Sequence, residues 1–331
     1  MRAARIEAFG PVDSHQFGEL PDPKPGPGEV LIDVHAIGVN FPDSLMVQGK
    51  YQVKPEHPFS PGRDAAGVVT EIGDGVTNVK IGDRVVTVYS YGAYAEQRVV
   101  AQERCFHLPD DVDFATGAGM ATTYLTAWIA LMSRGGYQPG EKVLVLGASG
   151  GVGLAAVQIA KAHGAYVVGG TMNPDKNGDV IRESGADAVV CTVGDDLVEN
   201  FRKDVFAVTD GYGVDICLDS IGGELFTAAL RTLAFAGRIV AIGFIDGIPT
   251  AKANYFNVKD ITLVGMGLDL HFRFRPQVPQ DAAADIFDLF KKGQIKPQVT
   301  DTYPLEDYVT ALSNFGSGKS VGKMILTTGR D

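Results

Sequence analysis

Cysteine is scarce in this chain, and Cys105, Cys191 and Cys217 stand far apart. There is no Cys-x-x-Cys pair, so the sequence supports neither a disulfide framework nor a cysteine-built zinc lobe. No apolar run reaches the ~18 residues that a membrane-spanning helix requires. The first residues, MRAARIEAFG, lack the apolar core of a signal peptide. These absences lead us to expect a cytoplasmic protein.

Basic residues are fewer than acidic residues in this chain. Lysine and arginine total 29 against 40 aspartates and glutamates, a formal net charge of -11. This balance argues against nucleic acid or an anionic membrane as the main partner, although a local site can still bind an anionic small molecule. The length of 331 residues, 45% of them hydrophobic, allows two domains with separate cores.

The first third of the chain has the pattern of short β-strands. The stretches EVLIDVHAIGVN (29–40) and AAGVVTEIG (65–73) are rich in β-branched residues and end in asparagine or glycine. Before them, DPKPGPGEV (22–30) contains too much proline and glycine for a helix. Short strands at this spacing predict a β-rich, barrel-like domain.

From about residue 115 the pattern changes to alternating helices and strands. KVLVLG (142–147) is an apolar strand of the kind buried on both faces of a parallel sheet, and the alanine-rich stretch after it is helical. Five further strands follow, with helical segments between them: 165–170, 186–190, 214–219, 237–243 and 261–268. The alternation predicts βαβ units in an α/β fold with a doubly wound parallel sheet. The tail has two amphipathic helices and a last strand, GKMILTT.

Glycines crowd the link between the first of these strands and its helix, in LGASGGVGLAA (146–156). Gly150 and Gly151 allow the backbone to turn and to approach a ligand without a Cβ, and Gly153 permits close helix–strand packing. The helix start offers free N–H groups and partial positive charge to a pyrophosphate. Ala148 at the first glycine position weakens the bare motif, and a packing turn is the alternative. The strand–loop–helix context nevertheless predicts dinucleotide binding.

The end of the second strand indicates which dinucleotide binds. An Asp or Glu here would hold the ribose 2′-hydroxyl of NAD, but the chain has Gly170 and Thr171, followed by Asn173 and Lys176. A hydroxyl and a cation without an acid suit the 2′-phosphate of NADP. The alternative for Lys176 is an ordinary solvated lysine beside Asp175. The sequence therefore predicts NADPH as the cofactor.

Several blocks of the chain resemble the medium-chain dehydrogenase/reductase superfamily, in its zinc-free NADPH:quinone oxidoreductase (zeta-crystallin-like) branch. They are PGPGEVLIDVHAIGVNFPDSLMVQGKY, PFSPGRDAAGVVTEIGDGVTNVKIGDRV, TYLTAWIAL and VLVLGASGGVGLAAVQIAKAHGA, in this order. The resemblance implies a GroES-like catalytic domain, residues 1–120 completed by 270–331, with a Rossmann domain inserted at 121–269. It also implies a homodimer joined through the last strand of the cofactor sheet.

The resemblance assigns cofactor contacts as well. Thr126 matches a threonine that touches the nicotinamide, with a helix residue bonded to its own backbone as the alternative. The other expected contacts are Ser149, Gly150, Gly151, Val152 and Gly153 at the pyrophosphate, Gly243, Phe244, Gly265 and Met266 on the nicotinamide side, and Asn40 from the catalytic domain.

Metal ligands are replaced at the positions that zinc-dependent relatives use. Those relatives have a cysteine where this chain has Asn40, and a Gly-His-Glu block where it has Arg63 and Asp64. The six histidines are scattered, without the spacing of a tetrahedral site. We therefore expect metal-free chemistry, for which the acceptor must already be electrophilic, as a quinone or a conjugated enone is.

Asn40 and Tyr51 are the candidate catalytic residues, because a developing oxyanion needs hydrogen-bond donors. Tyr51 in QGKY stands where related enoyl thioester reductases have a proton-donating or orienting tyrosine, and a phenol can fill either role. The alternatives are a strand-end cap for Asn40 and a packed loop aromatic for Tyr51.

The expected activity is NADPH-dependent, zinc-free hydride transfer to quinones or α,β-unsaturated carbonyls. An enoyl-CoA or acryloyl-CoA reductase is the alternative within the class. A low-turnover dinucleotide-binding protein with a structural or redox-sensing role is the alternative outside it. The stretch LDLHFRFRPQ (268–277) is expected to be an edge strand with solvated Arg273 and Arg275, or else a basic rim for the phosphates of an acyl-CoA.

Overall fold

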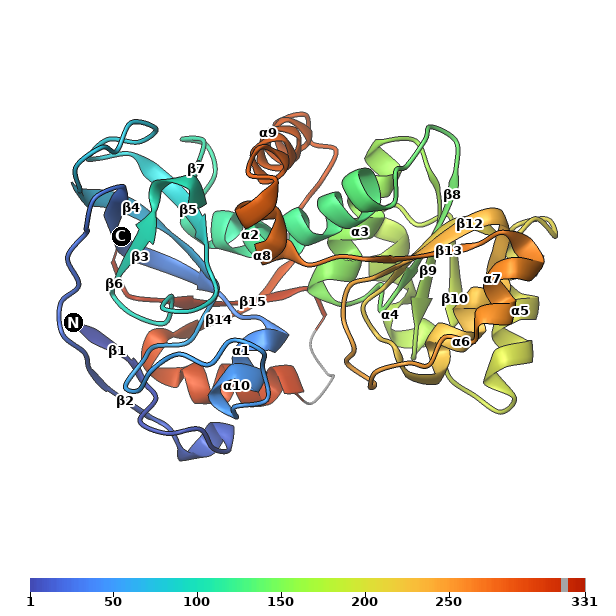
Figure 1. Cartoon of the computed structure of the whole chain (residues 1–331), viewed down its shortest axis with the longest axis horizontal. Helices are drawn as coiled ribbons and strands as arrows, with labels where there is room; N and C mark the ends of the chain where they lie inside the picture. Colours follow the sequence, from blue (N-terminus) through green and yellow to red (C-terminus); the bar gives the residue numbers. More distant parts are fainter. Residues whose placement is uncertain (317–320, 331) are drawn as a thin grey trace. The chain divides into compact units, whose positions relative to one another are not determined.

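The computed structural model describes residues 1–316 and 321–330, and the chain forms two compact units (Figure 1). One unit is Met1–Thr122 with Pro297–Asp331, and the other is Thr123–Lys296. The chain thus returns to the first unit at Pro297 and not at residue 270 as expected. The reason is that the tail's first long helix belongs to the second unit, where Asp285 accepts a hydrogen bond from Trp128 at 2.6 Å.

The first unit is β-rich, as predicted. Its strands are β1 (Arg2–Arg5), β2 (Gln16–Glu19), β3 (Glu29–Gly38), β4 (Asp64–Ile72), β5 (Arg84–Val88), β6 (Gln97–Ala101), β7 (Cys105–His107), β14 (Val299–Pro304) and β15 (Lys323–Thr327). Its helices are α1 (Phe41–Val47) and α10 (Tyr308–Gly316), with the 3-10 turns η1 (Val12–Ser14), η2 (Gln102–Arg104) and η4 (Leu305–Asp307).

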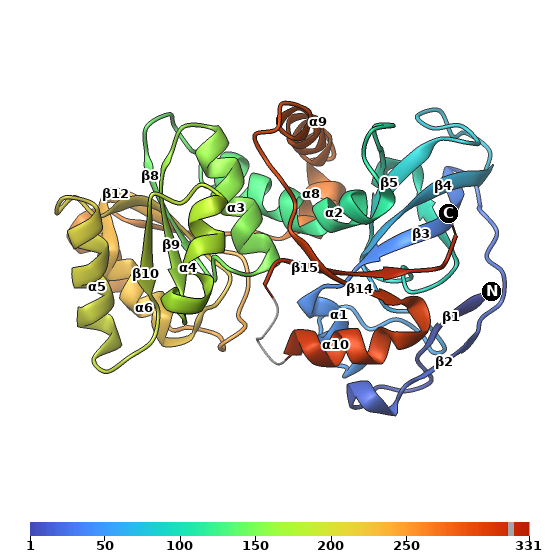
Figure 2. The ribbon, with the colours of Figure 1, turned by 180° about the vertical axis from the view of Figure 1, so that it is seen from behind.

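The last strand of the chain is built into the sheet of the first unit. The strand order is β14-β15-β3-β4-β5-β7, and β6 also pairs with β3. β15 lies beside β3 (Figure 2) and runs antiparallel to it, and the register from the backbone pairing places Ile325 opposite Gly38. This pairing places the first residue of β15, Lys323, close to the end of β3, where α1 begins.

The second unit contains the predicted alternation. Its strands are β8 (Lys142–Leu146), β9 (Tyr166–Thr171), β10 (Ala188–Cys191), β11 (Val214–Asp219), β12 (Leu233–Ala241) and β13 (Thr262–Gly265). Its helices are α3 (Gly151–Ala162), α4 (Pro174–Glu183), α5 (Leu197–Val208), α6 (Gly223–Thr232), α7 (Ala253–Lys259), α8 (Leu268–Phe274) and α9 (Gln277–Lys291). α2 (Phe114–Trp128) begins in the first unit and continues into the π-helical η3 (Ile129–Arg134).

The sheet of the second unit is doubly wound and entirely parallel, which confirms the predicted fold class. The strand order is β10-β9-β8-β11-β12-β13, so the order reverses between β8 and β11. In open parallel sheets, ligands bind beyond the carboxyl ends of the strands at such a reversal. Those strand ends are therefore where a cofactor site is expected.

Stretch 268–277 is not an edge strand: residues 268–274 form α8. Leu268, His271 and Phe272 are its buried residues, and they follow one another at the three- and four-residue spacing of a helix face. Arg273 and Phe274 are exposed. The alternation of Phe and Arg resembles a strand in four residues, but the longer helical period decides the structure.

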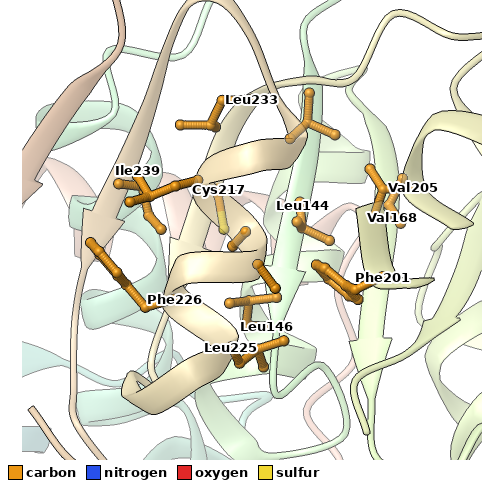
Figure 3. Packing of buried hydrophobic residues seen from close by; sticks show 14 of the residues in the cluster. Leu144, Leu146, Val168, Phe201, Val205, Cys217, Leu225, Phe226, Leu233 and Ile239 are labelled. Carbon is orange, nitrogen blue, oxygen red and sulfur yellow. The ribbon is translucent and has the colours of Figure 1, made fainter. Parts of the chain in front are cut away.

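One face of the parallel sheet is covered by α5 and α6, whose apolar residues form a shared core with the strands (Figure 3). Phe201 and Val205 come from α5, and Leu225 and Phe226 come from α6. They pack with Leu144, Leu146, Val168, Cys217 and Ile239 of the strands, all at most 5% exposed. This burial holds the strand ends in a fixed arrangement. Across the described residues, no helix has the length and apolar character to cross a bilayer.

Gln158 of α3 is hydrogen-bonded to the first and the last part of the second unit, where the chain enters and leaves it. Its Oε1 accepts the Tyr124 hydroxyl and the Lys296 N–H, both at 2.8 Å, and its Nε2 donates to the Lys296 carbonyl at 2.9 Å. Tyr124 is the second residue of the unit and Lys296 is its last. The glutamine is 4% exposed, so water does not readily replace these bonds.

We expect Gln158→Leu to lower the free energy of unfolding by about 2–3 kcal/mol, because it leaves buried polar groups of Tyr124 and Lys296 without partners. Leucine is a good helix former of similar size, so α3 itself should persist. The exposed Gln294, two residues before Lys296, provides the control Gln294→Leu. Urea unfolding monitored by circular dichroism measures both variants, and equal midpoints would contradict the fastening role.

Candidate active site

Two glycines shape the loop between β8 and α3. Gly147 has a φ of +68°, and a Cβ there would lie 2.9 Å from the Ile221 side chain. A Cβ on Gly153 would lie 2.1 Å from the Gly147 carbonyl oxygen, so α3 approaches the loop as closely as bare backbone allows. The packing role expected of Gly153 agrees with this distance. Sequence reasoning did not single out Gly147, although its place directly after an apolar strand was a usable signal.

The N-terminus of α3 is open toward a ligand. Gly150 is its N-cap residue and no side chain caps the helix end. By helix geometry, the N–H groups of Gly151, Val152 and Gly153 have no partner within the helix. The positive end of the helix dipole lies at the same place. Together with the glycines that admit close approach, this fits the pyrophosphate of a dinucleotide.

The strand ends at the reversal are fixed by Asp219, the last residue of β11. Its Oδ1 accepts the N–H groups of Ile221 at 2.8 Å and Gly222 at 2.9 Å. Burial raises the pKa of Asp219, and these two N–H groups work in the opposite direction. Ser220 donates to the Leu146 carbonyl at 3.3 Å, which ties the end of β11 to the end of β8. These hydrogen bonds hold the end of β11 in place beside the glycine loop.

The residues expected at the adenosine side lie after β9, but two of them are already engaged. Asn173 caps α4, its side chain accepting the Lys176 N–H at 3.0 Å. Thr171 is buried, and its hydroxyl oxygen accepts from Asn177 at 3.3 Å. The Asn177 amide also donates to Ser149 at 3.4 Å and so connects the tip of β9 to the glycine loop. Nothing in the sequence points to Asn177 beyond its place in the first turn of a helix. The Lys176 side chain is exposed.

The residues expected on the nicotinamide side lie at the carboxyl ends of the next parallel strands. The Gly243 N–H donates to the Asp219 carbonyl at 3.3 Å, and the Met266 N–H donates to the Ala241 carbonyl at 3.0 Å. Phe244 is 49% exposed. Gly265 ends β13, at the same edge of the sheet as the glycine loop. Thr126 instead lies buried in α2.

In the first unit, Asn40 precedes α1 with its side chain buried and fully engaged. Its Nδ2 donates to the Gly38 carbonyl at 3.0 Å and to Asp64 Oδ2 at 2.9 Å, and its Oδ1 accepts from Lys323 Nζ at 2.6 Å. An amide has two hydrogens, and both are used. The expectation that Asn40 donates a hydrogen bond to the substrate is therefore corrected, because no amide hydrogen is left for it.

Asn40 belongs to a buried cluster of charged side chains. Asp64 accepts from Lys323 Nζ at 3.1 Å, from the Thr122 N–H at 3.2 Å and from the Thr122 hydroxyl. Asp43 accepts from the Asn40 N–H at 2.9 Å and from the Tyr94 hydroxyl at 3.0 Å. Burial, reinforced by the nearby Asp64, raises the pKa of Asp43 to about 7. The cluster thus holds one ammonium, one carboxylate and one acid that keeps its proton up to neutral pH.

Sequence reasoning missed Lys323 and Asp43. A lysine at the start of a strand and an acid in the first turn of a helix are usually solvated, and nothing local distinguishes these two. Their burial depends on partners distant in the sequence, Asp64 of β4 for Lys323 and Tyr94 for Asp43, which only the fold brings together.

Tyr51, the second candidate catalytic residue, lies in the loop after α1. Its ring is half-buried against a small apolar cluster to which Met46, Val47 and Phe59 belong. α1 therefore has Asn40 before its first residue and Tyr51 shortly after its last.

The residues around Asn40 do not suit a metal ion. Lys323 brings a positive charge to Asn40 and Asp64, and an ammonium has no lone pair to offer. Within residues 1–316 and 321–330, no three His, Cys, Asp or Glu side chains are grouped so that they could hold a metal.

Known families match both units. The profile described as alcohol dehydrogenase GroES-like domain matches residues 26–110, and the one described as zinc-binding dehydrogenase matches residues 151–283.

Similar full-length proteins show which branch this is. Human quinone oxidoreductase is 34% identical over 330 residues, 98% of this chain and 97% of the human protein. Mycobacterial Rv1454c, solved in complex with NADPH, is 32% identical with a TM-score of 0.92 and covers 99% of this chain and 100% of that one. Escherichia coli quinone oxidoreductase, also complexed with NADPH, is 29% identical with a TM-score of 0.90 and the same coverage, 99% and 100%. This chain therefore belongs to the quinone oxidoreductase family, in the zinc-free branch of the medium-chain dehydrogenase/reductase superfamily.

Proposed function

We propose that this protein is an NADPH-dependent reductase that transfers hydride, without a metal ion, to quinones or α,β-unsaturated carbonyl compounds. The observation that carries the proposal is the uncapped N-terminus of α3, which approaches the preceding loop so closely that a Cβ on Gly153 would collide with the Gly147 carbonyl, at the reversal of the strand order. The two structural relatives that contain NADPH support the choice of cofactor.

The second unit supplies the groups that would hold NADPH, which brings the hydride when it is bound. The N–H groups of Gly151, Val152 and Gly153 would bind the pyrophosphate. The exposed ammonium of Lys176 would pair with the 2′-phosphate, and the buried Thr171, where an NAD-binding protein would carry an acid, would not repel it. The nicotinamide side is formed by Gly243, Phe244, Gly265 and Met266, with Thr126 as a further contact.

Tyr51 is the candidate donor to the oxyanion formed as hydride reaches the acceptor. Its ring is half-buried against the apolar cluster, and a phenol can both donate a hydrogen bond and release a proton. Asn40 has only an indirect role, because both hydrogens of its side-chain amide already donate to Gly38 and Asp64. A quinone or enone needs no Lewis acid, because the conjugated system spreads the incoming charge.

An enoyl-CoA reductase is the second candidate, and α8 is the observation that favours it. Arg273 and Arg275 are exposed there, with the Arg273 guanidinium 4.9 Å from the centre of the Phe274 ring. Such a group can bind the phosphates of an acyl-CoA. A binding protein with little turnover would use the same glycine loop and differ only in the absence of an acceptor.

We also propose a cytoplasmic homodimer joined through β13. This strand is at the edge of the six-stranded sheet. Leu263 on it is 42% exposed, and Val258, Leu270 and Phe274 near it in sequence are 77%, 59% and 66% exposed. An apolar sheet edge of this kind is suited to pairing with the same edge of a second copy. The three free cysteines agree with a reducing compartment.

We expect Lys176→Ala to weaken NADPH binding by about tenfold, ~1.4 kcal/mol, while NADH binding stays nearly unchanged, because only NADPH carries the 2′-phosphate. Lys203→Ala on α5 removes another exposed lysine and serves as the control. Fluorescence titration with each cofactor measures the affinities. A wild-type protein that binds NADH as tightly as NADPH would overturn the cofactor assignment.

We expect Tyr51→Phe to lower kcat by ~10²–10³, the usual cost of removing one central donor to an oxyanion. NADPH affinity should stay near the wild-type value, since the cofactor groups lie in the second unit. Tyr303→Phe, another half-exposed tyrosine of the first unit, is the control. Full activity of Tyr51→Phe in quinone reduction would remove Tyr51 from the mechanism and leave protonation to water.

We expect activity to survive exhaustive dialysis against a chelator, because Lys323 brings an ammonium to the cluster in which a metal ion would need ligands. Elemental analysis of the purified protein measures its metal content directly. About one zinc per chain, lost together with activity on dialysis, would show that the metal-free chemistry is wrong.

A further inference from the structure

Lys323 is a buried cation held by two side chains from other elements. Its side chain is 5% exposed and that of Asp64 is fully buried. Its ammonium donates to Asn40 Oδ1 at 2.6 Å and to Asp64 Oδ2 at 3.1 Å. A buried ion pair is costly to desolvate and contributes little net stability, so stability alone does not explain its presence, and a role in specifying a local arrangement does.

The backbone around Lys323 leaves room for its side chain. A Cβ on Gly38, the last residue of β3, would lie 2.8 Å from Lys323 Cε, 2.6 Å from the Ala118 carbonyl oxygen and 3.0 Å from Asp64 Oδ2. Glycine at position 38 therefore lets the lysine cross the end of β3. The ammonium thus reaches the amide that precedes α1.

The ammonium completes the hydrogen bonding of the Asn40 amide. The Gly38 carbonyl and Asp64 can only accept, so they bind the amide nitrogen and orient the amide. Lys323 can only donate, and it binds the amide oxygen that faces it. Without Lys323 the buried amide oxygen would lose this partner.

Asn40 in turn fixes the start of α1. Its backbone N–H donates to the Asp43 carboxyl group at 2.9 Å, and its carbonyl accepts the Asp43 N–H at 3.1 Å. At the other end of the helix, the Lys50 N–H donates to the Leu45 carbonyl at 2.9 Å. Met46 and Val47 belong to the cluster against which Tyr51 packs. A continuous set of contacts therefore runs from Lys323 through seven residues of helix to the loop of Tyr51.

We propose that Lys323 is a positioning residue for reduction, whose ammonium locks Asn40 and the start of α1 and thereby sets the place of the Tyr51 hydroxyl. This inference rests on the proposed function, in which Tyr51 donates to the substrate. Lys323 does not touch the reacting atoms in this account. Its effect on rate passes through α1.

A double-mutant cycle tests this directly, with Lys323→Met, Tyr51→Phe and the double variant measured for NADPH-dependent reduction of a benzoquinone. We expect Lys323→Met to lower kcat about tenfold to a hundredfold, as small misplacements of a reacting group do, with NADPH affinity unchanged. The double variant should be no slower than Tyr51→Phe alone, because Lys323 acts through that hydroxyl. Lys323→Arg keeps the charge and should restore part of kcat, and the exposed Lys292→Met should behave as wild type.

The outcomes separate this inference from the proposed function. If Tyr51→Phe is slow and the two substitutions multiply their effects, Lys323 does not act through Tyr51 and the inference is wrong, although the proposed function stands. If Tyr51→Phe is fully active, the donor itself is wrong and the inference falls with it. Wild-type kcat in Lys323→Met would also overturn it.

Lys323→Met leaves the buried Asp64 charge without its cation, which destabilises the folded state. The cycle is therefore repeated with a second variant that removes both charges. Lys323→Met combined with Asp64→Asn removes both charges. Circular dichroism and NADPH affinity establish that this variant is folded. It should show the same lowered kcat and the same lack of a further effect on Tyr51→Phe, and a wild-type kcat would contradict the inference.

Discussion

Helix α3 approaches the loop before it so closely that no side chain fits between them, and the second unit is organised around this contact. The space between the Gly153 Cα and the Gly147 carbonyl excludes even a methyl group, because a Cβ would lie 2.1 Å from that oxygen. The close approach aims the N–H groups of the first turn past the end of β8. The same helix carries Gln158, which fastens Tyr124 and Lys296 at the entry and exit of the unit. The helix that we propose binds the pyrophosphate therefore also holds the two ends of the second unit.

The first unit uses buried charge in place of buried apolar contact at the start of α1. A hydrophobic residue in place of Lys323 could fill its volume but could not donate a hydrogen bond to the Asn40 amide oxygen. The single ammonium beside Asp64, with Asp43 keeping its proton up to neutral pH, limits the cost of burying three ionisable groups. The arrangement trades stability for a defined position of Asn40 at the start of α1.

The sheet could be predicted from the sequence because its strands are short apolar runs with helices between them, and chain connectivity then fixes the parallel order. The glycine loop was recognisable by its place between strand and helix. The expectation of an edge strand at 268–277 was wrong, since alternating Phe and Arg fit the period of a strand, whereas the burial of Leu268, His271 and Phe272 fits that of a helix.

The engaged state of Asn40 and the burial of Lys323 were beyond sequence reasoning. Residue type shows which groups can donate, but only the fold shows where their hydrogens go. Asn40 is close to Asp64 and Lys323 because β3, β4 and β15 are neighbours in one sheet, and these strands come from opposite ends of the chain.

The central claim is that this chain uses NADPH to reduce electrophilic, conjugated acceptors. The most direct test follows NADPH oxidation by the purified wild-type protein with a benzoquinone, a 2-alkenal and crotonyl-CoA as acceptors, each against a reaction without protein. The account predicts protein-dependent oxidation of NADPH with the quinone or the alkenal. Tight binding of NADPH without oxidation in the presence of any of the three acceptors would contradict it and would identify a dinucleotide-binding protein without reductase activity.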